Sequence, residues 1–372
     1  SQQALDGAEV IFGGPRHLEL GQVETRGQAW PIPFSVEPVL ALKDRKVAML
    51  VSGDPFCFGG GTSVTQHLKP DDWVAFPAPS TFSQVCARLG WRLETTHTFG
   101  LHATPFAHLR PVIHDGQRVI CLMRDGAAPG ELAQWLTARG FGETTMNVLE
   151  SVGGPREKIR AQMASQFSLS DVTAPVVVAL DLRGKGMSRA SGLADAEFHH
   201  DGQITKRPVR AMTLSALAPR DGEVLWDLGA GSGSISVEWC LSAPMCQAVA
   251  VEQHSTRVAN IRSNITDFGL ERRMQVHEGS TPDLLDQLPA PDAVFIGGGA
   301  NADLLDRLWD RMAEGTRLVI NSVTLETEAL LIARHQSFGG TLMRFEISDA
   351  GALGSMRGWN ASRPVVQWSV TR

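Results

Sequence analysis

Short apolar runs alternate with stretches of helical periodicity along the first half of the chain. Runs of four to six residues, rich in Val, Ile, Ala and Phe, predict buried strands. The predicted strands are residues 8–12, 47–51, 73–76, 119–123, 146–149 and 175–180. Helical periodicity between them predicts helices at residues 62–68, 82–89 and 130–139. Strands that alternate with helices are typical of an α/β fold.

The alternation restarts more regularly in the second half, after a stretch rich in Gly, Ser, Lys and Arg. This stretch predicts a linker at residues 183–198, between a domain of residues 1–182 and one of residues 199–372. The predicted strands are residues 223–227, 247–252, 274–278, 293–296, 317–321, 341–347 and 364–370. The predicted helices are residues 206–217, 234–240, 255–268, 282–287, 302–312 and 325–338. Because no helix separates the last two strands, we expect a doubly wound sheet that ends in an antiparallel pair.

The length and the charge of the chain narrow the class of protein. Its 372 residues exceed what one hydrophobic core usually serves, in agreement with two domains. Lys and Arg number 34 against 40 Asp and Glu, so the chain lacks the basic excess of a general nucleic-acid binder. It contains no tyrosine, which excludes tyrosine chemistry.

The termini, cysteines and histidines indicate a protein of the reducing cytoplasm. Residues 1–6 are polar without a basic stretch, and no apolar run reaches the roughly 18 residues that span a bilayer. The five cysteines form no Cys-x-x-Cys pair, so we expect buried free thiols. The eleven histidines lack metal-ligand spacing. We therefore expect a cytoplasmic protein that binds no metal, no nucleic acid and no membrane.

A glycine-rich turn follows the first predicted strand of the second half. Asp227 and Leu228 lead into Gly229-Ala230-Gly231-Ser232-Gly233, and a predicted helix begins there. Glycines let a backbone approach a ligand closely, and a helix N-terminus offers free N–H groups to an anion. The Gly-x-Gly-x-Gly spacing departs from the Gly-x-Gly-x-x-Gly of dinucleotide sites. A purely structural turn would also account for it.

Two further features favour a ligand site over a structural turn. The next strand ends in Glu252, where an acid would meet a ribose. The third strand leads into Gly279-Ser280-Thr281, where an adenine edge could be met. Together the three segments resemble the class I S-adenosyl-L-methionine-dependent methyltransferases. The resemblance implies a Rossmann-like domain whose cofactor contacts come from these residues. They are Thr205, Asp227, Gly229, Ala230, Gly231, Ser232, Gly233, Glu252, Gly279, Ser280 and Thr281.

A narrower resemblance involves residues 200–210, 296–299 and 320–327, which read HDGQITKRPVR, IGGG and INSVTLET. They resemble the precorrin C15 methyltransferases that also remove the C12 acetate carboxylate. The resemblance implies a macrocyclic substrate with many carboxylates, which Arg and Lys would hold. We expect Gly297, Gly298 and Gly299 to let the macrocycle approach, and Asn321 or Ser322 to orient it. The expected carboxylate partners are Lys206, Arg210 and, from a Gly-rich lid loop at 351–358, Arg357.

The first half carries its own set of motifs. Residues 52–59 read SGDPFCFG, residues 77–82 read PAPSTF, and residues 122–126 read LMRDG. A Gly-Asp-Pro turn alone is common, but the set in this order resembles the class III tetrapyrrole methylases. The resemblance implies two α/β lobes, with a cofactor cleft lined by Gly53, Asp54, Ser80 and Thr81, and with Arg16 near the substrate. Members of that class begin with a strand and a Gly-x-Gly turn, so we expect this domain to lack its first strand.

The two halves together resemble the family of fused precorrin C5,15-methyltransferases (decarboxylating). The resemblance implies methylation of a precorrin-6 macrocycle at C5 and C15 with decarboxylation, in cobalamin biosynthesis, by a homo-oligomer. One alternative is a C15-only enzyme whose N-terminal domain is non-catalytic or truncated. An alternative of another class is an RNA- or protein-binding module with a vestigial cofactor fold. That alternative predicts a basic face or an Asn/Asp-Pro-Pro-Tyr motif, and the sequence has neither.

Overall fold

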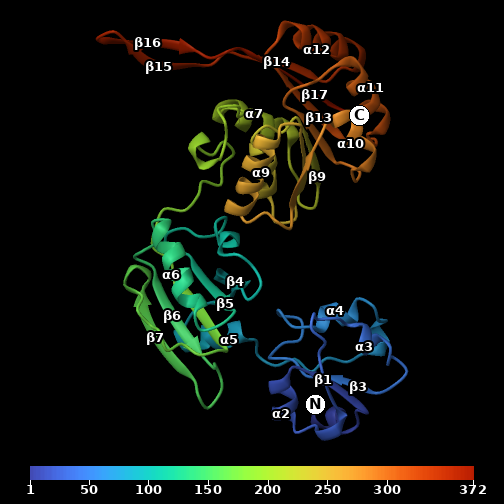
Figure 1. Cartoon of the computed structure of the whole chain (residues 1–372), viewed down its shortest axis with the longest axis vertical. Helices are drawn as coiled ribbons and strands as arrows, with labels where there is room; N and C mark the ends of the chain where they lie inside the picture. Colours follow the sequence, from blue (N-terminus) through green and yellow to red (C-terminus); the bar gives the residue numbers. More distant parts are fainter. The chain divides into compact units, whose positions relative to one another are not determined.

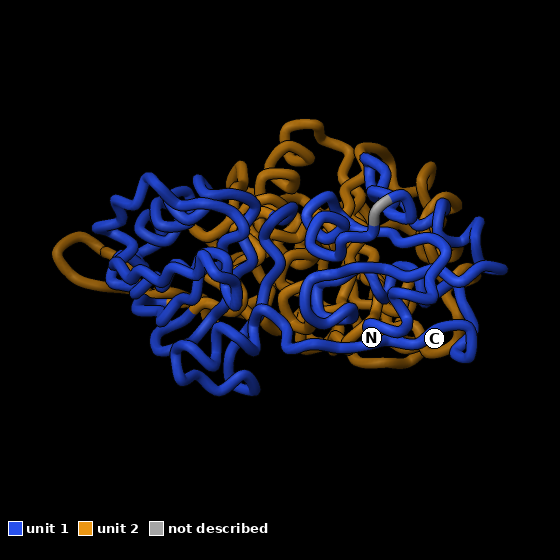
Figure 2. Tube along the Cα trace, turned by 90° about the horizontal axis from the view of Figure 1, so that it is seen from below, with its two compact units in different colours: residues 1–104, 114–185 blue, residues 105–113, 186–372 orange. Residues whose placement is uncertain are grey.

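The computed structural model describes residues 1–372 apart from the side chain of Glu24. The chain forms two compact units, which Figure 2 shows in two colours. Unit 1 contains residues 1–104 and 114–185, and unit 2 contains residues 105–113 and 186–372. Both units are α/β, which confirms the predicted fold class.

Unit 1 begins with a three-stranded parallel sheet of order β2-β1-β3. The strands are β1 (Val10–Gly13), β2 (Gly27–Ala29) and β3 (Val47–Met49). The helices around it are α1 (Gln2–Asp6), α2 (Pro15–Gly21), α3 (Glu37–Leu40) and α4 (Gly61–Thr65). The central strand β1 is buried on both faces: Val10 and Phe12 pack with Val39 and Val64, and Ile11 packs in a separate apolar cluster. Burial of alternate residues on opposite faces explains its unbroken apolar sequence.

The rest of unit 1 is a five-stranded mixed sheet of order β4-β5-β8-β6-β7. The strands are β4 (Thr96–Gly100), β5 (Arg118–Leu122), β6 (Thr145–Glu150), β7 (Lys158–Met163) and β8 (Val176–Asp181). Helices α5 (Thr81–Leu89) and α6 (Ala128–Ala138) belong to this part. The apolar runs correctly predicted the buried strands β5, β6 and β8. They missed β2, β4 and β7, whose residues are polar and mostly exposed or half-buried.

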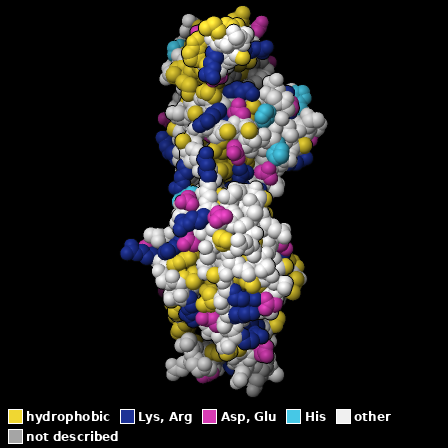
Figure 3. Space-filling model, turned by 90° about the vertical axis from the view of Figure 1, so that its left-hand side faces the viewer, with side chains coloured by type: hydrophobic (Ala, Val, Ile, Leu, Met, Phe, Trp, Pro, Cys, Tyr) yellow, Lys and Arg dark blue, Asp and Glu magenta, His cyan; other side chains and the backbone are white. Residues whose placement is uncertain are grey.

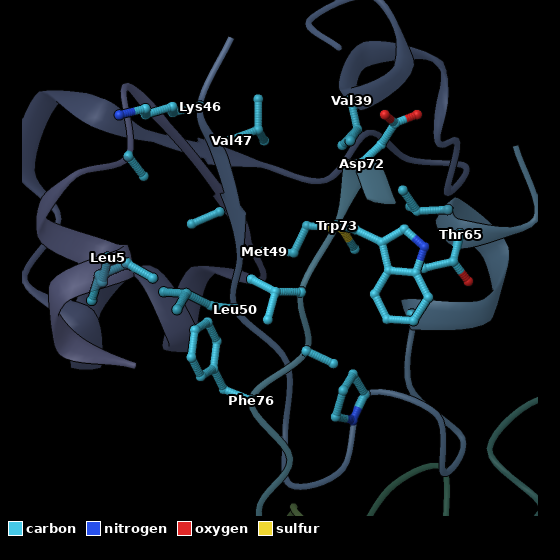
Figure 4. A pocket seen from close by; sticks show the side chains of 18 of the residues that line it. Leu5, Val39, Lys46, Val47, Met49, Leu50, Thr65, Asp72, Trp73 and Phe76 are labelled. Atoms are coloured by element: carbon cyan, nitrogen blue, oxygen red, sulfur yellow. The ribbon is translucent and has the colours of Figure 1, made fainter. Parts of the chain in front are cut away.

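The strand predicted at residues 73–76 is wrong. These residues follow the short 3-10 helix η2 (Pro70–Asp72) and have no regular structure, although Trp73 and Phe76 are apolar. Their side chains line a cavity of about 1190 Å³. Strand β3 also lines this cavity. Figure 4 shows Trp73 and Phe76 projecting toward Met49 and Leu50 at the end of that strand. An apolar run without a strand to pair with lacks the hydrogen bonds that define a strand.

Unit 2 contains a seven-stranded sheet of order β11-β10-β9-β12-β13-β17-β14. Strand β17 runs antiparallel to the other six, which are parallel to one another. The strands are β9 (Val224–Leu228), β10 (Gln247–Glu252), β11 (Met274–Glu278), β12 (Ala293–Ile296), β13 (Arg317–Ser322), β14 (Thr341–Phe345) and β17 (Val365–Thr371). All seven were predicted. The five inner strands are mostly apolar because they are buried on both faces, whereas the edge strands β11 and β14 are largely exposed or half-buried.

Helices cover both faces of this sheet, as expected of a doubly wound fold (Figure 1). Those whose residues share one core cluster are α7 (Arg207–Leu217), α8 (Ser234–Ser242) and α9 (Ser255–Asp267). Those of the opposite cluster are α11 (Ala302–Arg311) and α12 (Leu325–Phe338), and the short α10 (Thr281–Leu284) lies beside them. The sheet therefore separates two cores, with Trp239 in the first and Trp226 in the second.

A β-hairpin stands where the Gly-rich loop at residues 351–358 was expected. Its strands are β15 (Ser348–Leu353) and β16 (Met356–Ala361), and they pair only with each other among the described residues. The hairpin connects β14 to β17 and projects from the rest of unit 2 (Figure 1). Leu353, Met356 and Trp359 are each more than two thirds exposed on it. The prediction of a loop was wrong, because cross-strand pairing accommodates the Gly351–Gly358 pair within a regular ladder.

A short segment of the first half belongs to unit 2. It contains the 3-10 helix η4 (Phe106–Leu109), which packs on the end of α9. Arg110 donates from Nη1 to the carbonyl of Asp267 (2.9 Å), and its guanidinium lies 4.3 Å from the ring centre of Phe268. A Cβ atom at Gly269 would lie 2.6 Å from the backbone nitrogen of His108, so the two backbone segments are in close contact. Nothing in the apolar pattern marks this segment.

Among the described residues, no helix is long and apolar enough to cross a membrane. The same residues contain no group of three or more His, Cys, Asp or Glu side chains placed to hold a metal ion.

Candidate functional site

The glycine-rich turn of unit 2 lies at the carboxyl edge of the sheet, between β9 and α8. Gly229, Gly231 and Gly233 all have positive φ, of 69°, 60° and 70°. Glycine adopts such angles without the steric cost that a side chain brings. Gly233 also caps α8, where a Cβ would approach Ile261 to 3.2 Å and Met274 to 3.0 Å. Each glycine is therefore required by the backbone path.

Backbone and carboxylate hydrogen bonds tie this turn to β10. The N–H groups of Gly229 and Ala230 both donate to the carbonyl of Val251, each at 3.0 Å. The buried carboxylate of Glu252 accepts from the Gly231 N–H at 2.8 Å and from the His254 N–H at 3.0 Å. The glycine turn and the acid of the next strand thus form one structure.

The third turn joins the same structure. Gly279 donates its N–H to the carbonyl of Glu252 at 3.0 Å. Ser280 and Thr281 follow at the start of α10 and are half-buried. The three segments that the sequence grouped therefore lie side by side at this edge.

The triple glycine after β12 touches the glycine turn directly. A Cβ at Gly229 would lie 2.8 Å from the carbonyl oxygen of Gly298, and one at Gly297 would lie 3.2 Å from the carbonyl oxygen of Gly229. Cβ atoms at Gly298 and Gly299 would instead meet open space, and both residues are exposed. The strand end therefore offers a surface without side chains next to the turn.

Two buried polar atoms at the turn have no hydrogen-bond partner among the described residues. They are Oδ1 of Asp227 and Oγ of Ser232. The other carboxylate oxygen of Asp227 accepts from Oγ (2.7 Å) and N–H (3.2 Å) of Ser236. Burial raises the pKa of Asp227 to about 6. Unsatisfied buried atoms are rare and mark places where a ligand completes the structure, so the site fits a polar cofactor.

The segment before α7 passes beside the glycine turn. The carbonyl oxygen of Gln203 lies 3.5 Å from where a Cβ of Gly231 would be. Thr205 follows and is half-buried, and its carbonyl accepts from Arg210 at 2.5 Å. Lys206 is the N-cap residue of α7, and its exposed side chain makes no capping hydrogen bond. Its Nζ atom lies 4.0 Å from the carboxylate of Asp195. Thr205 and Lys206 therefore lie near the turn, as the sequence predicted.

Arg210 is buried among structural partners, which argues against the prediction that it holds a substrate carboxylate. Its side chain is completely buried. Nε donates to Glu238 (2.6 Å), Nη1 to Asp195 (3.0 Å) and Nη2 to the carbonyl of Leu193. Glu238 also accepts the N–H groups of Gly192 (2.6 Å) and Leu193. The guanidinium thus holds the predicted linker against α7 and α8, in the interior of unit 2.

Asn321 and Ser322 also have structural partners. The amide of Asn321 donates to Thr213 (2.8 Å) and accepts from Gln367 (2.8 Å), in a network between α7, β13 and β17. The hydroxyl of Ser322 is buried and exchanges hydrogen bonds with the backbone of Thr324. The expectation that one of them orients the substrate is not supported, because these contacts occupy their polar groups. Arg357 lies on strand β16 of the hairpin that projects from the sheet (Figure 1).

In unit 1 the Gly-Asp-Pro turn meets the Ser/Thr-rich turn. Gly53 has φ +65°, and a Cβ there would lie 3.1 Å from the carbonyl oxygen of Pro79. Asp54 accepts the Phe56 N–H at 2.8 Å and so stabilises its own turn. Ser80 caps α5 by accepting the Ser83 N–H at 3.1 Å. Gly53 also lines the 1190 Å³ cavity, so a hollow adjoins these turns.

Arg16 directly precedes His17, which the sequence also makes a candidate for holding a substrate carboxylate. Arg16 is exposed in the first turn of α2. The Nε2 atom of His17 lies 2.8 Å from Oγ of Ser52, just after β3. The Nδ1 atom of His17 is buried and has no partner among the described residues. Thr81, the remaining predicted residue, is half-buried at the start of α5.

Surface charge is mixed on the face that Figure 3 shows. Lys and Arg side chains alternate there with Asp and Glu, and with uncharged areas, and they form no continuous basic surface. A backbone-tracking nucleic-acid interface would present basic side chains together.

Two family models match the chain. The one described as a precorrin methyltransferase domain matches residues 196–372, and the one described as tetrapyrrole (corrin/porphyrin) methylases matches residues 2–167.

Similar proteins extend over the whole chain. The precorrin-6Y C(5,15)-methyltransferase (decarboxylating) of Sinorhizobium sp is 43% identical over 98% of this chain and 90% of its own length. A protein of the same name from Mycobacterium tuberculosis is 37% identical over 100% of this chain and 95% of its own length. The solved C-terminal domain of precorrin-6Y C5,15-methyltransferase from Rhodobacter capsulatus is 53% identical, with a TM-score of 0.49. That alignment covers 50% of this chain and 100% of the domain.

The fold and the matching domains define the class of this protein as a C-methyltransferase, in which a tetrapyrrole methylase domain precedes a Rossmann-like methyltransferase domain. Identity over nearly the full length then specifies the family. The chain belongs to the precorrin-6Y C(5,15)-methyltransferases (decarboxylating).

Proposed function

We propose that the chain transfers methyl groups from S-adenosyl-L-methionine to C5 and C15 of precorrin-6Y and releases the C12 acetate carboxylate as carbon dioxide, in cobalamin biosynthesis. One observation carries this proposal for unit 2. The glycine turn, Glu252 and the open Gly297–Gly299 turn meet at one edge of the sheet, which supplies a cofactor cradle beside a surface that a flat macrocycle can approach.

The bound cofactor supplies an electrophilic methyl group on a sulfonium. Helix α8 begins directly after the turn, so the N–H groups of its first residues would bind a carboxylate of the cofactor, apart from that of Ser236, which donates to Asp227. Glu252 is already fixed by two backbone donors, and its remaining lone pairs would accept the ribose hydroxyls. Such positioning is the main contribution a protein makes to a displacement by carbon.

Decarboxylation passes the electron pair of the broken C–C bond into the conjugated ring, and the carbon left behind gains a proton, from the ring position that loses one on methylation or from solvent, to become a methyl group. This step needs the macrocycle held in place, and it needs no side chain to take up a proton. Lys206 is an exposed cation that follows the segment beside the glycine turn, and we assign it to a substrate carboxylate.

We assign C5 methylation to residues 1–182 and C15 methylation with decarboxylation to residues 199–372, joined by residues 183–198. The contact between Gly53 and the Pro79–Ser80 turn, next to the cavity, supports a second cofactor site built from Gly53, Asp54, Ser80 and Thr81. The alternative, a C15-only enzyme, has a single cofactor site. Self-association and a cytoplasmic location remain predictions from the resemblance and the composition.

Mass spectrometry of the product separates these two proposals. Incubation of the full chain with precorrin-6Y and S-adenosyl-L-methionine should add two methyl groups and remove one carbon dioxide. One methyl group with decarboxylation would support the C15-only alternative. Titration with S-adenosylhomocysteine should give two sites per chain, and a chain with no site would contradict the methyltransferase proposal altogether.

A further inference from the structure

Arg16, His17 and Ser52 gather at the carboxyl edge of the first sheet of unit 1. Strands β1 and β3 are parallel neighbours, with Phe12 beside Met49, so the residues that follow them meet at the same edge. Arg16 and His17 lie in the first turn of α2 after β1, and Ser52 follows β3. The His17–Ser52 hydrogen bond of 2.8 Å joins the two segments.

The environment of His17 determines which nitrogen carries its proton. Burial, together with the neighbouring Arg16, lowers the pKa of His17, so the imidazole is neutral at pH 7 and has a single N–H. With the proton on Nε2, His17 donates to Oγ of Ser52, and the buried Nδ1 is an acceptor without a partner among the described residues. We assign this tautomer because a buried N–H without an acceptor is rarer in proteins than a buried acceptor without a donor. His17 therefore donates from Nε2 to Oγ of Ser52.

This assignment directs the Ser52 hydroxyl outward. Because Oγ accepts from His17, the serine O–H is left to donate to another group, and Ser52 is exposed. Arg16, which directly precedes His17, has an exposed guanidinium that forms no ion pair with any described residue. A guanidinium and a directed hydroxyl are both donors, and such a pair recognises a carboxylate.

We propose that Arg16 and Ser52 bind a carboxylate side chain of the tetrapyrrole at the N-terminal methylation site, and that His17 positions the Ser52 hydroxyl. This inference rests on the proposed function of unit 1. The subsite directly precedes the Gly53–Asp54 turn, so a carboxylate held there would fix how the ring lies against that turn. The subsite would in this way help to select C5 as the methylated carbon.

Steady-state kinetics of the full chain, with the methyl groups of the product counted by mass spectrometry, tests the subsite. Ser52→Ala should raise the KM for precorrin-6Y in C5 methylation about 5- to 10-fold, the effect of one lost hydrogen bond to a charged group, with kcat within about 2-fold. His17→Leu should do the same, because Ser52 loses its orienting donor. His17→Gln should restore most of the KM, since its amide N–H reaches the same oxygen.

Controls come from the same chain. His67→Gln alters an exposed histidine of unit 1 and should leave both methylations unchanged. C15 methylation, measured in the same samples, reports substrate quality in every variant. If His17→Leu does not fold, Ser52→Ala and Arg16→Ala decide the question.

An unchanged KM in Ser52→Ala and Arg16→Ala would overturn the subsite. So would a His17→Gln variant as impaired as His17→Leu, or a loss of thermal stability without a change in KM, because either result assigns the pair a structural role only. Failure of the proposed function differs from all of these. In that case the wild-type chain itself adds no methyl group at C5 and binds no S-adenosylhomocysteine in unit 1.

Discussion

Gly229→Ala should selectively disable the C-terminal methylation site. Gly229 has a positive φ of 69°, and a Cβ there would lie 2.8 Å from the carbonyl oxygen of Gly298. The substitution therefore combines an unfavourable backbone angle with a backbone clash. The clash forces the glycine turn away from the Gly297–Gly299 turn, the two segments that form the proposed cradle.

The two costs can be separated with a matched control. A left-handed angle costs an alanine about 1–2 kcal/mol, and overpacking costs about 1–3 kcal/mol more. Gly222 lies just before the other end of β9, with φ +87°, and a Cβ there meets nothing within 4 Å. Gly222→Ala should therefore lower the free energy of unfolding only by the cost of the backbone angle, about 1–2 kcal/mol. Gly229→Ala should lower it by about 2–5 kcal/mol, because both costs apply.

Chemical denaturation and product analysis measure both effects. Gly229→Ala should lower the free energy of unfolding of unit 2 by more than Gly222→Ala does, and should abolish one of two S-adenosylhomocysteine sites. Its product should carry one added methyl group and retain the acetate carboxylate. Equal stabilities and equal cofactor binding in the two variants would refute the reasoning, because the contact with Gly298 would then have no consequence.

Four further substitutions test other parts of unit 2. Asp227→Asn should flatten the pH dependence of stability, because the pKa of Asp227 is about 6 in the folded protein against an ordinary value of 3.8. Wild-type stability therefore falls as the pH rises from about 4 to 6, by on the order of 3 kcal/mol, and denaturation at pH 4 and pH 7 measures this loss. Arg210→Ala should lower the free energy of unfolding by about 3–5 kcal/mol, because it leaves the buried Glu238 carboxylate without its ion-pair partner. The loss should appear as a lower melting temperature, and a stable variant with a raised KM would contradict this structural role. Lys206→Ala should instead raise the KM of C15 methylation, with stability changed by less than about 0.5 kcal/mol. Glu252→Gln should weaken S-adenosylhomocysteine binding to unit 2 about 10-fold or more by calorimetry, since an amide NH₂ would face a backbone N–H; unaltered affinity would argue against the ribose role.

The apolar pattern predicted the fold best where strands are buried on both faces. Strands β9, β10, β12, β13 and β17 of the unit 2 sheet are of this kind, and the pattern also found the more exposed edge strands β11 and β14. Strand β7 was missed because its residues are polar and only partly buried, so its pairing with β6 leaves no apolar signature. The run at residues 73–76 produced the opposite error, since it is apolar without a strand partner. Pairing is a tertiary property, and local composition reports it only through burial.

Site residues could likewise be predicted where the constraint is local, and not where it depends on partners distant in the sequence. The glycine turn could be predicted because its positive φ angles require glycine, and this constraint is visible in one short segment. The structural role of Arg210 was not predicted because its partners, Glu238 and Asp195, come from distant parts of the chain. The His17–Ser52 pair was missed for the same reason. A histidine after Gly-Gly-Pro-Arg gave the only signal, and it did not indicate which residue it would meet.

The sequence alone determined the order of strands and helices in unit 2, the glycine turn between β9 and α8, and the acid at the end of β10. These features depend on burial and on backbone angles, which act on residues close together in the chain. Tertiary structure alone decided which polar groups remain available to a ligand. It committed Arg210 to the interior, left Lys206 exposed, and joined His17 to Ser52, because the partner that occupies or directs a polar group is brought to it only by the folding of the whole unit.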